Sequence, residues 1–178
     1  MNFPYRFKVV FLSFLAVFIC YIDRVNISVA IIPMQDQFGW SELQVGIILG
    51  SFYFGYMITM ILGGYLADKY GGKKVLGYGL LIWSLFTIIT PFFAYSGLWW
   101  LILIRVLMGL GEGITFPSWH SIYARWIPFN ERTRAVAFTN SGIAAGTVFG
   151  YVVAAAIISN YSWAVSYTHL TLPTKQDV

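Results

Sequence analysis

Long apolar runs separated by short polar stretches extend along nearly the whole chain. The runs predict five helices, over about 8–32, 43–66, 75–95, 98–118 and 135–158. A helix of about 20 apolar residues is long enough to cross the hydrocarbon core of a bilayer. The pattern therefore predicts an all-α fold, a polytopic membrane helix bundle with five transmembrane helices.

The composition supports a membrane protein. Of the 178 residues, 58% are hydrophobic and 10% are charged, and the mean hydropathy is +0.71. A soluble domain carries about 25% charged residues. The expected partner is the lipid bilayer, and the formal charge of +4 calls for no nucleic acid. The single cysteine, Cys20, excludes an internal disulfide, and we expect no metal site and no cofactor.

The first apolar run has a second interpretation as a cleaved signal peptide. Arg6 and Lys8 precede it, and the segment 28–30 resembles a cleavage site. The run is longer than a signal peptide, and Asp23 and Arg24 interrupt its end. A retained transmembrane helix is the favoured interpretation.

Lysine and arginine occur only in alternate connections between the predicted helices, whereas the connections 33–42 and 96–97 contain none. Basic loops stay on the cytoplasmic side of a membrane. We expect a multi-pass protein of the cell membrane with a cytoplasmic N-terminus and with 67–74 and 119–134 inside. The basic residues on this side are Arg6 and Lys8 before the connections, and Lys69, Lys73, Lys74, Arg125, Arg132 and Arg134 within them.

Four ionisable residues fall inside the predicted helices: Asp23, Arg24, Arg105 and Glu112. Each costs about 2.5–3.5 kcal/mol near a helix centre, so such residues face the interior of a bundle and form pairs. Depth estimates from the helical rise allow an Asp23–Arg105 pair. Arg105 and Glu112 are seven residues apart, so they share one face of the fourth helix.

These charges predict a pathway for an anion and a proton. Arginine presents a planar fork that suits a carboxylate or a phosphate. A nearby arginine holds a buried carboxyl in its charged form, and an anion that occupies the arginine weakens this effect. Anion and proton uptake would then be coupled. The alternative is that the charges only hold helices together.

Small residues recur along three helices, and Pro117 is expected to bend the fourth. Small residues at four-residue spacing let membrane helices approach closely. The residues concerned are Ser51, Gly55, Thr59 and Gly63, then Gly109, Gly111 and Gly113, and finally Gly142, Gly146 and Gly150.

Three stretches resemble signatures of a known family. "GYLADKYGGKK", residues 64–74, resembles the loop-2/3 signature of the major facilitator superfamily. "YIDRVNISVA" and "RVLMGLGEGITFPSWHSIYARWIPFNERTRA" resemble the first-helix and fourth-helix signatures of its anion:cation symporter branch. The resemblance extends to Trp163. It implies the N-terminal six-helix half of a twelve-span transporter that couples anions to protons or sodium.

The resemblance also implies roles for single residues. Asp23 and Glu112 correspond to proton-coupling acids, and Asn140 to part of a sugar-acid motif. The implied substrate contacts further include Arg24, Arg105, Tyr21 and Tyr56. Conformational or gating roles are implied for Gly64, Asp68, Lys69, Gly71, Lys73, Lys74 and His120, and for Arg132 and Arg134, which we expect to pair with Asp68.

The end of the chain differs in character from the rest. The run "VSYTHL", residues 165–170, resembles a translated transposon-end sequencing adaptor. We therefore divide the chain into a transmembrane bundle over 1–164 and a non-native tail over 165–178, which we expect to pack loosely. A native polar tail is the alternative.

The sequence thus predicts a secondary active transporter for proton-coupled symport of an organic anion, such as a sugar acid, a uronate or a sialate-like carboxylate. The alternative within the family is a sodium-coupled transporter of phosphate or another anion. The alternative of another class is a membrane packing subunit that transports nothing. An enzyme is not expected, because Asp23 and Glu112 lack an accompanying nucleophile or metal set. The chain alone is expected to be a truncated, inactive fragment whose partner is the missing C-terminal half.

Overall fold

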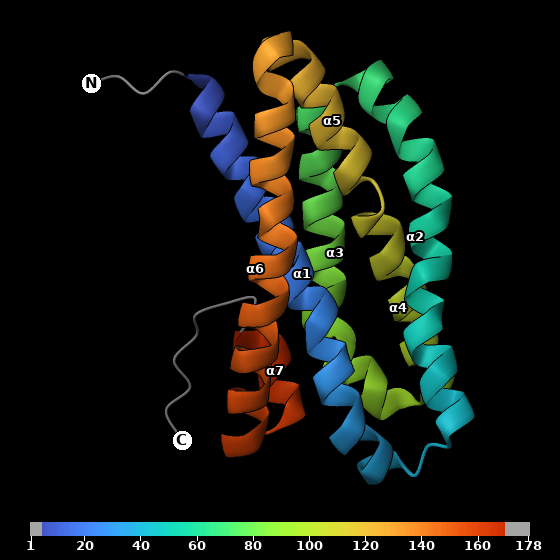
Figure 1. Cartoon of the computed structure of the whole chain (residues 1–178). Coiled ribbons are helices and arrows are strands. Elements are labelled where there is room, and N and C mark those ends of the chain that lie inside the picture. Colours follow the sequence, from blue (N-terminus) through green and yellow to red (C-terminus); the bar gives the residue numbers. More distant parts are fainter. Residues whose placement is uncertain (1–4, 170–178) are drawn as a thin grey trace.

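The computed structural model describes residues 5–169, with side chains to residue 167, and contains no strand within that part of the chain. Figure 1 shows a bundle of long helices running between two ends. The elements are α1 (Tyr5–Phe38), α2 (Glu42–Tyr70), α3 (Gly72–Ser96), α4 (Leu98–Glu112), α5 (Thr115–Trp126), α6 (Phe129–Asn160) and α7 (Trp163–His169).

The predicted all-α bundle is confirmed, with five segments in the described region long and apolar enough to span a membrane. The helices extend beyond the predicted apolar runs, because polar residues continue them past the hydrocarbon. Most of the predicted connection 119–134 is helical, and only Ile127 and Pro128 separate α5 from α6. The sharp turns before α2, α3 and α4 contain glycines with positive φ at Gly39, Gly71 and Gly97.

The fourth span is broken in its middle. α4 ends at Glu112 and α5 begins at Thr115. Proline has no N–H to donate, so Pro117 leaves the carbonyl of Gly113, four residues earlier, without its helical partner. The bend predicted from Pro117 is confirmed, and it lies directly after Glu112.

The long helices form two groups. α1 packs chiefly against α6, whereas α2 and α3 pack against α4 and α5. Glycines line both seams: a Cβ on Gly146 would lie 2.4 Å from the carbonyl oxygen of Phe18, and one on Gly55 would lie 2.1 Å from that of Val106. Backbone meets backbone at these points, which confirms the expectation of close helix approach.

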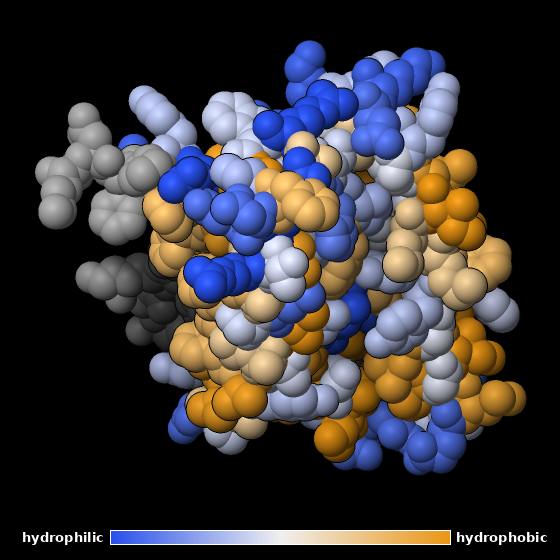
Figure 2. Space-filling view, turned by 45° about the horizontal axis from the view of Figure 1, so that its top comes forward, coloured by the Kyte–Doolittle hydropathy of each residue, from blue (hydrophilic) through white to orange (hydrophobic). Residues whose placement is uncertain are grey.

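The surface is that of a protein surrounded by lipid. Large apolar side chains are exposed along the flanks of the bundle, and hydrophilic side chains gather toward one end (Figure 2). The N-termini of α1, α3 and α6, which carry most of the basic residues, lie at this end in Figure 1. Exposed apolar residues include Ile61, Leu81, Phe92, Trp99, Val148 and Val152.

The segment after Trp163 packs more tightly than the sequence predicted. α7 contacts α1, α3 and α6. Ser166 and Tyr167 are buried, and Tyr167 joins an apolar cluster with Met34 and Leu101. Loose packing was therefore the wrong expectation for residues 165–167, because the apolar faces of neighbouring helices accept these side chains. Residues 170–178 lie outside the described part, and the adaptor origin stays a prediction.

The glycine seam between α2 and α4 gives a prediction about stability. A Cβ on Gly55 meets the α4 backbone, which cannot yield as a side chain can. Gly55→Ala should therefore cost about 1–3 kcal/mol and lower the unfolding temperature in detergent.

Gly50 is the matched control, because it lies in the same helix with no atom within 4 Å of an added Cβ. Gly50→Ala should leave the unfolding temperature unchanged or raise it slightly. Equal unfolding temperatures for the two variants would contradict the packing.

Candidate functional site

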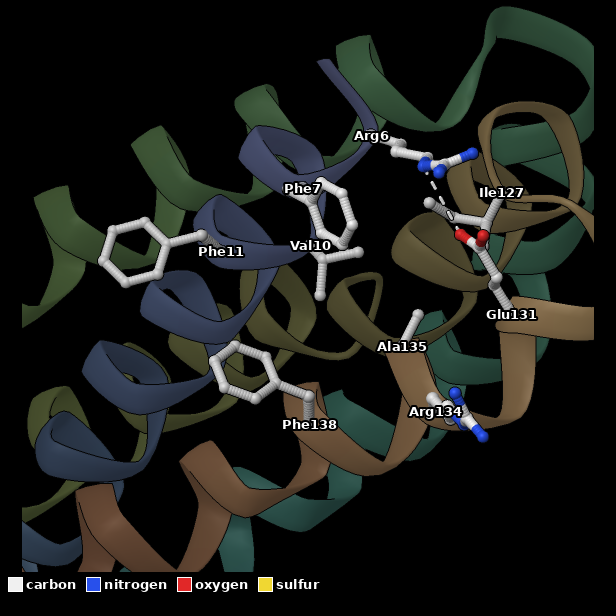
Figure 3. Close-up of a pocket in the computed structure, with 9 residues that line it drawn as sticks. All are labelled: Arg6, Phe7, Val10, Phe11, Ile127, Glu131, Arg134, Ala135 and Phe138. Carbon is white, nitrogen blue, oxygen red and sulfur yellow. Dashed lines mark ion pairs between the residues drawn. The ribbon is translucent and has the colours of Figure 1, made fainter. Parts of the chain in front are cut away.

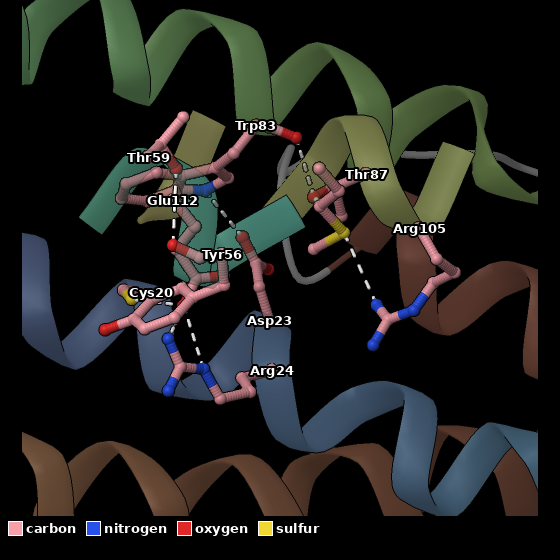
Figure 4. A network of polar contacts seen from close by, with 10 residues as sticks. Cys20, Asp23, Arg24, Tyr56, Thr59, Trp83, Thr87, Arg105 and Glu112 are labelled. Atoms are coloured by element: carbon pink, nitrogen blue, oxygen red, sulfur yellow. Dashed lines mark hydrogen bonds and ion pairs between the residues drawn. The ribbon is translucent and has the colours of Figure 1, made fainter. Parts of the chain in front are cut away.

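A buried ion pair joins the two helix groups. Arg24 of α1 donates from Nε to Oε1 of Glu112 on α4 at 2.9 Å, and its Nη2 contacts the same oxygen. Cys20, one turn earlier on α1, donates its thiol to that oxygen at 2.8 Å. Glu112 is fully buried, and its Oε2 has no hydrogen-bond partner among the described residues. Figure 4 shows these side chains converging between the helices.

Aromatic rings surround the guanidinium group of Arg24. Its Cζ lies 4.7 Å from the ring centroid of Tyr21, 5.2 Å from that of Phe52 and 4.9 Å from that of Tyr56. Rings at these distances stabilise a cation through their negative faces. The side chain is still 14% exposed. The Arg24 end of the ion pair is therefore less completely covered by the bundle than the Glu112 end.

Arg105 is buried without an acid. Its side chain is 2% exposed, and its Cζ lies 4.9 Å from the centroid of Phe52, the ring that Arg24 also faces. Nη1 donates to Sδ of Met108 at 3.4 Å, which is a weak acceptor. Within residues 5–167 no carboxylate lies within 4.0 Å of it, and its Nε has no hydrogen-bond partner. Arg105 is a buried cation that lacks a counter-ion from this bundle.

Asp23 points to a different helix from its neighbour Arg24. Its Oδ2 accepts a hydrogen bond from Nε1 of Trp83 on α3 at 3.1 Å, and its Oδ1 has no partner in the described part. The allowed Asp23–Arg105 pair does not form among these residues. One step along a helix turns a side chain by about 100°, so equal depth does not bring two charges together.

The other expected substrate contacts divide into two groups. Tyr21 and Tyr56 lie at the ion pair, as described. Asn140 is exposed on α6 and makes no side-chain hydrogen bond to any residue that the structure describes. The bundle therefore does not bring Asn140 to the buried charges.

The loop signature has a different partner from the one expected. Ser121 on α5 donates to Oδ1 of Asp68 at 3.1 Å, and Arg125 donates to the carbonyl oxygen of Asp68 at 3.1 Å. Arg132 instead donates to the carbonyls of Ile127 and Ala124 at the α5–α6 turn. Pairing of Asp68 with Arg132 or Arg134 was the wrong expectation, because α5 packs against α2 whereas α6 packs against α1.

The remaining gating candidates lie at the basic end. Lys69 lies over the rings of Tyr65 and Tyr70 at the end of α2. His120 is exposed and stacks on Trp119 with 3.7 Å between ring centroids. The other members are Gly64, which has open space around it, Gly71 at the turn with φ +89°, and Lys73 and Lys74 in the first turn of α3.

Three residues of the site were missed from the sequence: Cys20, Phe52 and Trp83. Cys20 had a usable signal, because it precedes Arg24 by four residues and so shares its helical face. Phe52 precedes Tyr56 by the same spacing. Trp83 lies in the apolar run "LLIWSLF" with no charged neighbour, and no pattern in the sequence indicates it.

The arrangement suits two chemical tasks. Two guanidinium groups face one phenyl ring, and one of them has no acid, so they can hold an anion through charge-assisted hydrogen bonds. Two buried carboxyl groups, each with one oxygen lacking a partner among the described residues, can bind a proton. The thiol and the aromatic rings complete a mainly apolar lining around these four charges.

Comparison with known proteins identifies the family. The sequence model of the family described as "Major Facilitator Superfamily" matches residues 13–172 of this chain. The chain is 45% identical over 162 residues to "Probable anion transporter 4, chloroplastic" of Oryza sativa subsp. japonica, covering 91% of this chain and 27% of that protein. It is 44% identical over 162 residues to "Ascorbate transporter, chloroplastic" of Arabidopsis thaliana, covering 91% of this chain and 30% of the relative.

A third relative has a different named substrate. The chain is 43% identical over 174 residues to "Sodium-dependent phosphate transport protein 1, chloroplastic" of Arabidopsis thaliana, covering 97% of this chain and 34% of that protein. The chain thus spans 27–34% of the length of these relatives. Their names agree with the resemblance to the anion:cation symporter branch and with a transporter that is not an enzyme. This chain belongs to the Major Facilitator Superfamily.

Proposed function

We propose that this chain is the N-terminal bundle of a secondary active transporter that moves an organic anion together with a proton. The observation that carries the proposal is Arg105, a buried arginine with no carboxylate partner in the described part, beside the ion pair of Arg24 and Glu112. A cation in such a place needs an anion from outside the bundle. The anion:cation symporter resemblance and the anion-transporter names of the relatives support the same function.

The ion pair supplies the coupling in this proposal. The anion binds to Arg105 and competes with Glu112 for the fork of Arg24. Once Arg24 turns to the anion, Glu112 loses its main source of positive charge and is left in an apolar site. A carboxyl in that environment favours the protonated form. Anion binding and proton uptake therefore occur together.

Asp23 provides a second proton site in the same mechanism. Its carboxylate has no basic partner among the described residues, and only Trp83 donates to it. The proton affinity of Glu112 depends on whether Arg24 is paired with it. The proton affinity of Asp23 depends instead on desolvation and on one neutral donor, Trp83. The two acids are thus proposed to take protons under different conditions.

The proposed substrates are sugar acids, uronates and sialate-like carboxylates. A sodium-coupled transporter of phosphate is the second candidate, favoured by the printed name of one relative. The arginine fork binds carboxylate and phosphate equally well in geometry. The distinction therefore lies in the coupling ion, which the experiment below varies.

The proposed transport cycle requires more of the protein than this chain. Alternating access requires two bundles that move around a site near the membrane midplane. We propose that the chain alone moves no solute, and that its partner is a C-terminal half of the longer protein. The α2–α3 turn with Asp68, held by Ser121 and Arg125, is proposed to change between conformations in that longer protein, together with the neighbouring lysines and His120.

The proposed location is a cell membrane with the basic end of the bundle in the cytoplasm. Support comes from the positive-inside rule and from the gathering of basic residues at one end. The chloroplastic names of the relatives make a chloroplast membrane the alternative.

The orientation can be tested by cysteine labelling of intact cells. Asp36→Cys should react with an impermeant maleimide added outside, because residue 36 lies at the end of α1 opposite to the basic end. Lys73→Cys should react only after the cells are opened. The native Cys20 is fully buried and gives little background. Labelling of position 73 in intact cells would contradict the orientation.

The coupling role of Glu112 can be tested in proteoliposomes with the longer protein. Glu112→Gln keeps size and hydrogen bonding but cannot release a proton. Uptake driven by a pH gradient should be lost, whereas anion exchange in counterflow, which needs no net proton release, should survive in part. The same assay with a sodium gradient separates the two candidate coupling ions. A Glu112→Gln protein that still accumulates anion with a pH gradient would place the proton elsewhere.

The anion role of Arg105 gives a prediction about geometry. Arg105→Lys keeps the charge and loses the planar fork, so both uptake and counterflow should fall about tenfold or more, through loss of charge-assisted hydrogen bonds. Lys8→Arg is the matched control, since Lys8 is exposed at the end of α1. Arg105→Lys with unchanged activity in both assays would remove Arg105 from the anion site.

A further inference from the structure

A groove lies between the first turns of α1 and α6, away from the buried ion pair. Its volume is about 470 Å³. Figure 3 shows charged side chains at one end of the groove and phenyl rings at the other. Arg6, Glu131 and Arg134 provide the charged end, and Phe11 and Phe138 provide the apolar end.

The charged end has an excess of one positive charge. Nε of Arg6 lies 3.4 Å from Oε2 of Glu131, and both side chains are more than a third exposed. Arg6 makes no hydrogen bond to any residue in the described part, and its ion pair there is with Glu131. Arg134 is exposed and has no ion pair there. A group with one negative charge, such as a phosphodiester, would neutralise the groove.

The apolar end continues toward the lipid. Phe11 is 53% exposed and Phe138 is 47% exposed, and they line the groove from α1 and α6. Val10 and Ala135 complete the wall between them. This surface has the apolar character of an acyl chain. In the membrane the same surface provides shape for one chain, and the arginines provide the preference for charge.

The groove also lies at the correct depth for a lipid headgroup. It opens at the basic end of the bundle, where α1 and α6 begin (Figure 1). Basic pockets between transmembrane helices on the cytoplasmic side bind anionic headgroups. A small soluble anion would contact only the charged end of the groove, whereas a phospholipid can contact the charged end and the two phenyl rings at once.

We propose that this groove binds one anionic phospholipid, with its phosphodiester between Arg6 and Arg134 and one acyl chain along Phe11 and Phe138. The lipid takes over part of the role of Glu131 as the counter-ion of Arg6. Because Arg6 belongs to α1 and Arg134 to α6, the bound lipid holds the basic ends of these two helices together. The proposal is independent of which solute the transporter moves.

Native mass spectrometry of the 178-residue chain can test this proposal. The chain is released from detergent with phosphatidylglycerol or phosphatidylcholine of the same acyl chains. One phosphatidylglycerol should bind at least tenfold more tightly than phosphatidylcholine, and Arg6→Gln/Arg134→Gln should abolish that difference, since each basic residue near a surface contributes about 1 kcal/mol. Phe138→Ser should weaken binding of both lipids, because it shortens the apolar wall.

Lys73→Gln/Lys74→Gln is the matched control. It removes two positive charges from the same end of the bundle, on α3 and outside the groove. This variant should keep the preference for phosphatidylglycerol, and glycerophosphoglycerol, which lacks acyl chains, should not compete. The circular dichroism spectrum of each variant checks that the helices are retained.

Three outcomes would overturn the proposal. Equal loss of preference in the lysine variant would mean that surface charge alone attracts the lipid. Competition by glycerophosphoglycerol or inorganic phosphate would indicate a site for a soluble anion. Lipid binding to this chain but not to the longer protein would indicate that a helix from the rest of that protein occupies the groove.

Discussion

The ion pair between Arg24 and Glu112 is the interaction around which the bundle is organised. Hydrocarbon cannot solvate either charge, so α1 and α4 must lie close enough for the side chains to meet. The glycines of α2 and α4 permit this, since Gly109 brings the α4 backbone against the carbonyl of Phe52. Phe52 in turn covers the guanidinium of Arg24. Close packing and charge pairing are therefore parts of one arrangement.

The same reasoning explains which features the sequence could predict. The bilayer sets the length of every span and forces ionisable residues inward, so the five helices and the burial of Glu112 and Arg105 followed from composition and spacing. The contact partners of these buried charges could not be predicted from the sequence. Asp23 and Arg24 are adjacent in the chain, yet the rotation of the helix sends one to Trp83 on α3 and the other to Glu112 on α4.

The other differences between the sequence predictions and the structure arise from contacts between helices. Asp68 accepts a hydrogen bond from Ser121 of α5 because α5 packs on α2. The periodicity of the sequence does not predict which helices pack together. Phe52 and Trp83 looked like ordinary apolar residues until the charges beside them were placed. Tyr167 is buried because neighbouring helices offer apolar surface, whatever the origin of the codons that encode it.

The two arginines differ in a way that gives the proposed mechanism its order. An anion that reaches Arg105 displaces a thioether contact and competes with no carboxylate of the described residues. An anion that reaches Arg24 must compete with a carboxylate that already contacts two nitrogens of the guanidinium. Binding at Arg105 is thus the easier first step, and rearrangement at Arg24 the step with a cost. In the proposed mechanism protonation of Glu112 lowers that cost, so the proton and the anion would each promote the binding of the other, as thermodynamic linkage requires.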